Sequence, residues 1–340
     1  MNQPLVVEVT RGDLVESVHE VSACAVDARG ATLYEAGDVE APVYLRSAAK
    51  PFIAAAVIEA GAGDRFGFDA REIAVMAGSH AGQPFHVDAV RSILRKIGMQ
   101  PSALQCGAQW PYDEVTANAL RRAGEEPTVL HNNCSGKHAG ILALCEVAGA
   151  DPATYLRADN PAQRRILEFC ARLSDDDAAR WPIAIDGCGI PVYATSLKKA
   201  ALSFARLASL HGIDERTAAA LRAVREAMVA HPQYVAGTGQ LDTELMLAAE
   251  GSVAAKAGAE GVHGIAAIAQ ECGYVSKVRD GAARARGPST VAALCDLGVL
   301  NGAQAAALTR FGAPSVYNRA GRVVGEVRVS PGAVEKASIS

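Results

Sequence analysis

The segment RSAAKP, at residues 46–51, contains a serine and a lysine three residues apart. Positions three apart lie on one face of a helical turn, so the Lys50 amine can reach the Ser47 hydroxyl. A serine hydroxyl becomes nucleophilic when a base takes its proton, and a lysine can be that base when burial or a nearby cation lowers its pKa. The same pair also fits an ordinary helix start, in which Ser47 is the N-cap and Lys50 is solvated.

The segment AGSHAGQPFH, at residues 77–86, surrounds the Ser79 hydroxyl and two imidazoles with small residues. Its glycines allow a ligand to approach the backbone closely. A turn that leads into a helix near Phe85 explains the same composition, with Ser79 or His80 satisfying local backbone groups. The residues alone leave both interpretations open.

Two cysteines in glycine-rich segments, HNNCSGKHAG at residues 131–140 and DGCGIP at residues 186–191, could supply thiolates to a zinc ion. A tetrahedral site needs one or two further ligands, and Lys137 and His138 are the nearest candidates. Because lysine is a rare metal ligand, chemistry alone favours His138 as the partner of Cys134 and Cys188. Two buried free cysteines in adjacent loops are the simpler alternative.

A further lysine, Lys256, begins the segment KAGAEG near the end of a strand late in the chain. On a strand that faces a cleft, it could bring its charge to a substrate carboxylate or lower the pKa of another lysine. On an edge strand, the same residue would commonly prevent aggregation between sheet edges.

The elements that must position these residues fall into three stretches. β-branched residues and turn signals between 5 and 36 predict short antiparallel strands, and the Ala- and Leu-rich middle predicts helices at 47–60, 85–97, 137–147, 161–173 and 217–229. After Gly251 we expect strands at 254–256, 264–269 and 274–279, a helix near 289–297 and a hairpin of 316–317 with 323–329.

This order predicts an α+β fold in one catalytic unit. Its antiparallel sheet is built from both chain termini, at about 1–45 and 251–330, with a helical lobe at about 47–250. Sequential βαβ alternation is absent, and no glycine-rich phosphate loop of the GxGxxG or GxxxxGK type occurs, so nucleotide binding has no support.

Composition favours a compact protein that binds a small polar molecule. The chain has 340 residues, 50% hydrophobic and 21% charged, which supplies a core easily. Its net charge of -4 comes from scattered residues and aromatics are only 5%, which argues against a nucleic-acid partner or a membrane surface. Acidic residues in the first twenty positions disfavour a secretion signal, so we expect a cytoplasmic protein whose eight cysteines are mostly free thiols or metal ligands.

Taken in order, the five segments resemble the asparaginase II family, the bacterial L-asparaginases of the Rhizobium etli type. The resemblance extends from the strand near Val7 to the hairpin near Val329. It implies a fold similar to that of serine β-lactamases and class A glutaminases, which agrees with the sheet and helical lobe expected from the sequence pattern.

The resemblance also implies roles for the serines and lysines. Ser47 would be the nucleophile and Lys50 its base, while Ser79 and Lys256 would form a second Ser-Lys pair. Two lysines in one pocket disfavour each other's charge, so one of them can stay neutral and accept a proton. Arg46, beside the nucleophile, could bind a substrate carboxylate through its guanidinium.

Members of the family carry one zinc ion held by two cysteines and a lysine. The resemblance therefore implies that Cys134, Lys137 and Cys188 are the ligands, which replaces the choice of His138. In that arrangement His138 and Asp186 would orient the ligands or contact the substrate.

The reaction implied is hydrolysis of L-asparagine to L-aspartate and ammonia, in a protein expected to form a homodimer. A glutaminase is the nearest alternative, since a pocket discriminates one methylene by only about 1 to 3 kcal/mol. A penicillin-recognising acyl-enzyme would use the same Ser-x-x-Lys, but it would meet its substrate outside the cytoplasm. A non-catalytic, zinc-stabilised module that binds a small amino acid is the alternative from another class.

Overall fold

The computed structural model describes residues 2–331 and divides the chain into two compact units. The sheet unit contains the described residues 2–43, 195–209 and 244–331, and the helical unit contains residues 44–194 and 210–243. Residues 195–209, which the sequence pattern assigns to the helical lobe, therefore belong with the sheet. In residues 2–331 no helix has the length and apolar character needed to cross a bilayer.

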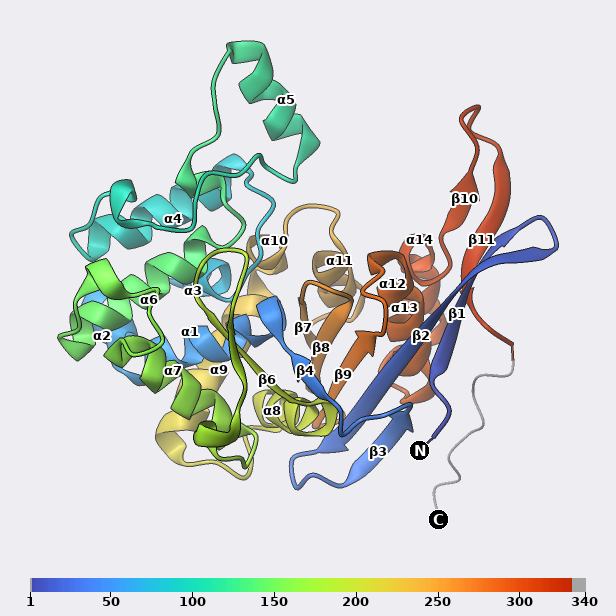
Figure 1. Ribbon diagram of the computed structural model, residues 1–340, viewed down its shortest axis with the longest axis horizontal. Helices are drawn as coiled ribbons and strands as arrows, with labels where there is room; N and C mark the ends of the chain where they lie inside the picture. Colours follow the sequence, from blue (N-terminus) through green and yellow to red (C-terminus); the bar gives the residue numbers. More distant parts are fainter. Residues whose placement is uncertain (1, 332–340) are drawn as a thin grey trace. The chain divides into compact units, whose positions relative to one another are not determined.

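Within the described residues, eight strands form the main sheet, in the order β10-β11-β1-β2-β9-β8-β7 with β3 paired to β2. The pairs are antiparallel, and Val7 of β1 pairs with Val329 of β11, so strands from the two ends of the chain lie side by side (Figure 1). The expected α+β fold, with a sheet built from both termini, is confirmed. The strands are β1 (Leu5–Arg11), β2 (Leu14–Asp27), β3 (Thr32–Ala36), β7 (Val253–Ala257), β8 (Val262–Ala267), β9 (Cys272–Val278), β10 (Ser315–Tyr317) and β11 (Val323–Val329).

The centre of this sheet is buried on both faces, which is why β8 lacks polar alternation. Helix α8 (Leu197–Ser209) packs closely on one face because Gly264 and Gly273 carry no side chain. A Cβ on Gly264 would lie 2.1 Å from the Phe204 ring. Neighbouring residues of a strand point to opposite faces, so His263 lies on the other face, where it hydrogen-bonds Thr290 of α12 (Ala283–Asp296).

Helix α12 begins at Ala283, earlier than the helix expected near 289–297. The predicted helix starts after Pro288, because proline lacks the N–H that a helix interior requires. In the structure this proline lies inside the helix. Two short helices follow α12 in the sheet unit, α13 (Gly302–Ala307) and α14 (Thr309–Gly312).

The helical unit contains all five helices expected in the middle of the chain, with ends shifted by a few residues. Helices α1 and α6 are buried along most of their length, so they form its core. Gly136 lets α6 approach α3, since a Cβ there would lie 2.3 Å from Val75 O. The helices are α1 (Lys50–Glu59), α2 (Ala62–Phe66), α3 (Ala70–Met76), α4 (Pro84–Lys96), α5 (Glu114–Ala123), α6 (Ser135–Ala148), α7 (Pro161–Leu173), α9 (Glu215–Ala230) and α10 (Pro232–Val235), and α11 (Leu241–Ala248) spans the boundary of the two units.

A small sheet in the order β4-β6-β5 was not expected from the sequence. Its strands are β4 (Pro42–Tyr44), β5 (Ile183–Ile185) and β6 (Pro191–Ser196). Strands β5 and β6 form a hairpin whose turn is closed by Asp186 N–H donating to Ile190 O at 2.8 Å. This turn carries the residues of the DGCGIP segment.

Candidate active site

The Ser-x-x-Lys segment begins as a tight turn rather than as a regular helix. Residues Arg46–Ala49 form a 3-10 helix, and α1 starts at Lys50. Arg46 has a φ of 51°, a left-handed conformation that costs a residue with a side chain roughly 1 kcal/mol. Such strain persists where the surroundings fix the backbone, and it is concentrated at functional sites.

The structure brings Lys50 to Ser79. The Lys50 Nζ donates to Ser79 Oγ at 2.8 Å and to Asn133 O at 3.3 Å. Within residues 2–331 no hydrogen bond joins the side chains of Lys50 and Ser47, the pair that sequence spacing suggests. The Asn133 carbonyl gave no sequence signal, because every residue type has one.

The charge of Lys50 is disfavoured by its surroundings. The side chain is 0% exposed, and this burial lowers its pKa. The ammonium of Lys137 lowers it further, while the sulfurs of Cys134 and Cys188 oppose the shift. A lysine in this setting is suited to accept a proton from a hydroxyl.

Three candidate metal donors converge in the helical unit. Cys134 is the N-cap of α6, Lys137 lies in the first turn of that helix, and Cys188 lies in the β5–β6 turn. Lys137 Nζ is 2.9 Å from Cys188 Sγ, and the two thiols are hydrogen-bonded. Two sulfurs and a nitrogen fit the donor preference of zinc, with a fourth position left for water or substrate.

The ionisation of this cluster also suits a cation. Hydrogen bonding from the Cys188 thiol holds the pKa of Cys134 well below its usual range, with help from the charges of Lys137 and Lys50. Burial favours the neutral amine of Lys137, but the cysteine sulfurs and Asp186 outweigh it and raise its pKa. Across the described residues no group of three or more His, Cys, Asp and Glu side chains could hold a metal ion, so a site here needs the lysine.

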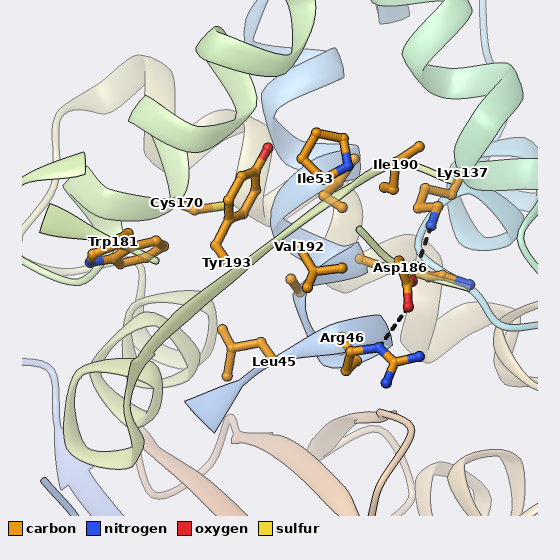
Figure 2. A pocket seen from close by; sticks show the side chains of 13 residues that line it. Leu45, Arg46, Ile53, Lys137, Cys170, Trp181, Asp186, Ile190, Val192 and Tyr193 are labelled. Atoms are coloured by element: carbon orange, nitrogen blue, oxygen red, sulfur yellow. Dashed lines mark hydrogen bonds and ion pairs between the residues drawn. The ribbon is translucent and has the colours of Figure 1, made fainter. Parts of the chain in front are cut away.

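Asp186 links this cluster to the Ser-x-x-Lys segment. Arg46 Nε donates to Asp186 Oδ1 at 2.6 Å, and Asp186 Oδ2 lies 4.0 Å from Lys137 Nζ (Figure 2). Although burial opposes it, the charges of Lys137 and Arg46 lower the pKa of Asp186. In the described chain the Arg46 side chain makes this ion pair and no other hydrogen bond, and it is 27% exposed.

A small cavity lies between the first turn of α1 and β6. Arg46, Asp186 and Lys137 line its polar end, and Cys170, Trp181 and Tyr193 gather at its apolar end (Figure 2). Its volume of about 20 Å³ suffices for one water molecule, so this cavity alone does not enclose an amino acid.

His138 is fully buried beside the lysines. Its Nδ1 is hydrogen-bonded to the Tyr155 hydroxyl at 2.8 Å, and its Nε2 has no partner within the part of the chain that the structure describes. Burial lowers the pKa of His138 well below its usual value, so the ring is neutral. Nothing in the sequence pointed to Tyr155, which follows His138 by 17 residues.

Lys256 lies in the sheet unit, whereas the other candidate residues lie in the helical unit. It is on β7, is 1% exposed and donates to Ala257 O at 2.6 Å. All eight cysteines are free, and Cys295 is the exposed one.

Acid should destabilise the fold through His86. Burial lowers its folded-state pKa to about 4, whereas an unfolded histidine titrates near 6.5. The unfolded state therefore binds more protons between these values, and stability is lost as the pH falls through that window. From pH 7.5 to pH 5.0 the loss is about 2 kcal/mol.

Urea unfolding at pH 7.5 and pH 5.0 would measure this loss. We expect His86→Gln, which cannot titrate, to lose about 2 kcal/mol less than the unaltered chain over the same range. Equal losses in the two proteins would show that His86 does not contribute.

Comparison with known proteins gives one family match. A family model described as L-asparaginase II matches residues 7–329. No curated protein matches the sequence significantly.

Among solved structures, the chain is 14% identical to Mglu in its tris and glutamate form (TM-score 0.45, covering 88% of this chain and 64% of that chain). It is also 14% identical to Mglu in its native form (TM-score 0.43, covering 83% and 64%). The chain thus spans less than two thirds of the length of these two Mglu chains.

Proposed function

The chain belongs to the L-asparaginase II family, and from this premise we propose that it is an amidohydrolase that converts L-asparagine to L-aspartate and ammonia. One observation of the structure carries the proposal. A fully buried lysine, Lys50, lies at 2.8 Å from the hydroxyl of Ser79 and three residues after Ser47. A lysine with a lowered pKa beside serine hydroxyls is an arrangement for activating a nucleophile.

In the proposed reaction Ser47 Oγ attacks the side-chain amide carbon, and its proton passes to neutral Lys50. The C–N bond breaks, and the proton moves to the leaving nitrogen, which departs as ammonia. Water then hydrolyses the ester with the same lysine as base, which regenerates Ser47. Ser79, bonded to Lys50, and Lys256 are proposed as the second Ser-Lys pair in this proton transfer.

We propose that Cys134, Lys137 and Cys188 hold one zinc ion. When bound, zinc would supply Lewis acidity and positive charge to the site. Lys137 would give up a proton on metal binding, because a ligand must offer a lone pair.

Arg46, Asp186 and His138 are proposed to contact the substrate. Arg46 uses Nε for Asp186, which leaves the outer guanidinium nitrogens for a carboxylate. His138 has an unpartnered and buried Nε2 that could meet a polar substrate group.

We further propose that the protein acts in the cytoplasm as a homodimer. The free state of all eight cysteines supports a reducing compartment. The dimer rests on the family resemblance alone.

The test is ammonia release by the purified protein, with L-asparagine and L-glutamine at equal concentrations and zinc content measured. Ammonia release mainly from L-asparagine is the expected result. Release mainly from L-glutamine would show that the protein is a glutaminase instead. Release from neither, together with thermal stabilisation by asparagine, would replace the enzyme with a binding module.

A further inference from the structure

Two histidines of the AGSHAGQPFH segment have no part in the proposed chemistry, yet both are completely buried. His80 and His86 are each 0% exposed, and their rings stack with centroids 4.9 Å apart and planes 18° from parallel. They flank the loop that follows Ser79, between α3 and α4. Two polar rings removed from water in this way require defined partners.

The partners of His80 allow one tautomer. The Gly82 N–H donates to Nδ1 at 3.2 Å, so Nδ1 carries no hydrogen. The hydrogen is therefore on Nε2, which donates to Ser135 Oγ at 2.8 Å. The Ser135 hydroxyl in turn donates to Leu130 O at 3.0 Å. His80 thus joins its own loop to the first turn of α6.

His86 has the same tautomer and reaches another element. The Gln83 N–H donates to its Nδ1 at 3.1 Å, and its Nε2 donates to Gln233 O at 2.8 Å. Gln233 lies in α10, which ends at Val235, and Val235 O accepts the Ser79 N–H at 2.7 Å. The carbonyl that fixes the Ser79 backbone therefore lies in a helix that His86 holds in place.

The backbone of His80 shares an acceptor with the catalytic lysine. Asn133 O accepts the His80 N–H at 3.2 Å and a hydrogen bond from Lys50 Nζ at 3.3 Å. The backbone is closely packed just before Ser79, since a Cβ on Gly78 would lie 2.7 Å from Val235 O. Loss of the His80 ring bonds to Gly82 and Ser135 would remove the restraint on the segment after Ser79 and let Ser79 shift relative to Lys50.

We propose that His80 is a positioning residue that holds the Ser79 hydroxyl at hydrogen-bonding distance from Lys50, through its Nε2–H tautomer and with His86 as its support. The inference rests on the proposed amidohydrolase function and adds to it a residue that does not touch the substrate. Burial lowers the pKa of both rings, which agrees with neutral histidines at this place.

Two substitutions separate the two hydrogen bonds of the His80 ring. His80→Asn keeps an acceptor for the Gly82 N–H and loses the donor to Ser135, and His80→Gln keeps the distant donor and loses the acceptor. We expect each to lower kcat about tenfold, and His80→Leu, which loses both, about 100-fold. KM should change less than twofold and zinc content should not change, because the ring bonds to Ser135 and Gly82 rather than to the proposed metal donors.

Ser135→Ala removes the Ser135 bond from the other side. It should lower kcat as His80→Asn does, and the double variant should be no slower than either single one, since both remove the same interaction. Asn160→Ala is the matched control. Asn160 is a buried polar residue of the helical unit, and its side chain bonds to Ala162 N, Asp151 O, Thr154 Oγ1 and Cys145 Sγ. Its loss should lower stability and leave kcat unchanged.

The outcomes are distinct. The kcat of each His80 variant is compared with that of Asn160→Ala at matched thermal stability. If the two fall by the same factor, His80 has only a structural role and the proposal is overturned. ¹⁵N spectra of the histidines, assigned with His80→Gln, should show hydrogen on Nε2 alone, and hydrogen on Nδ1 would also overturn it. Absence of ammonia release from the unaltered protein would instead be a failure of the proposed function.

Discussion

Ammonia release from L-asparagine should fall by about 1,000-fold or more when Lys50 is replaced by methionine. Methionine fills the buried space of the lysine stem but can neither accept a proton nor hydrogen-bond Ser79, whose Oγ is 2.8 Å from Lys50 Nζ. The loss should appear in kcat, measured from initial rates at saturating substrate. Lys198→Met, at a half-buried lysine of the sheet unit, is the control and should keep its activity.

The two serines can then be ranked. Ser47→Ala should match the loss of Lys50→Met if Ser47 forms the ester, whereas Ser79→Ala should lose less if Ser79 only transfers the proton. Turnover near the normal value in Ser47→Ala would reject Ser47 as nucleophile. It would transfer that role to Ser79, the hydroxyl that Lys50 contacts.

The second large effect is expected on metal content. Cys134→Ala removes one of the three proposed protein ligands, so zinc per chain, measured by mass spectrometry of the dialysed protein, should fall from near one to near zero. KM for L-asparagine should rise about tenfold or more if the metal positions the substrate. Lys137→Met should give the same result, because the lysine completes the donor set.

Cys145→Ala is the matched control for the metal. Cys145 is buried in the same helix, α6, and contacts Asn160 Oδ1 at 3.8 Å, away from the proposed donors. It should keep its zinc. Full zinc content in Cys134→Ala would show that the proposed donor set is wrong.

The sequence predicted those parts of the fold whose signal is local. β-branched residues and turn signals predicted the N-terminal strands, and Ala- and Leu-rich segments predicted helices such as α7 and α9. Strand β5 was not predicted because it has only three residues. Strand β6 was not predicted because all its residues are buried, so it shows no alternation of apolar and polar residues. Nothing local in the sequence shows that α8 packs on Gly264 and Gly273, so the pattern could not group residues 195–209 with the sheet unit.

Within the candidate site, sequence spacing did not predict the hydrogen bond that Lys50 makes in the structure. Three positions separate it from Ser47, but its side chain extends to Ser79, 29 positions away. Only the tertiary fold sets that distance. The residue types of the metal cluster could be recognised from the sequence, whereas their convergence depends on the β5–β6 turn, which brings Cys188 to Lys137.

The pairing of β1 with β11 has a consequence for how the protein is made. Val7 and Val329 are about 320 residues apart in the chain. At a translation rate of roughly 5 to 20 residues per second, about 15 to 60 s pass between the synthesis of β1 and that of its neighbour β11. During that interval one edge of β1 is unpaired, and an unpaired edge is where strands of other chains add. The helical unit, residues 44–194 and 210–243, is synthesised before β11, so the sheet is completed last. The yield of folded protein should therefore depend on keeping nascent chains apart until β11 has been made.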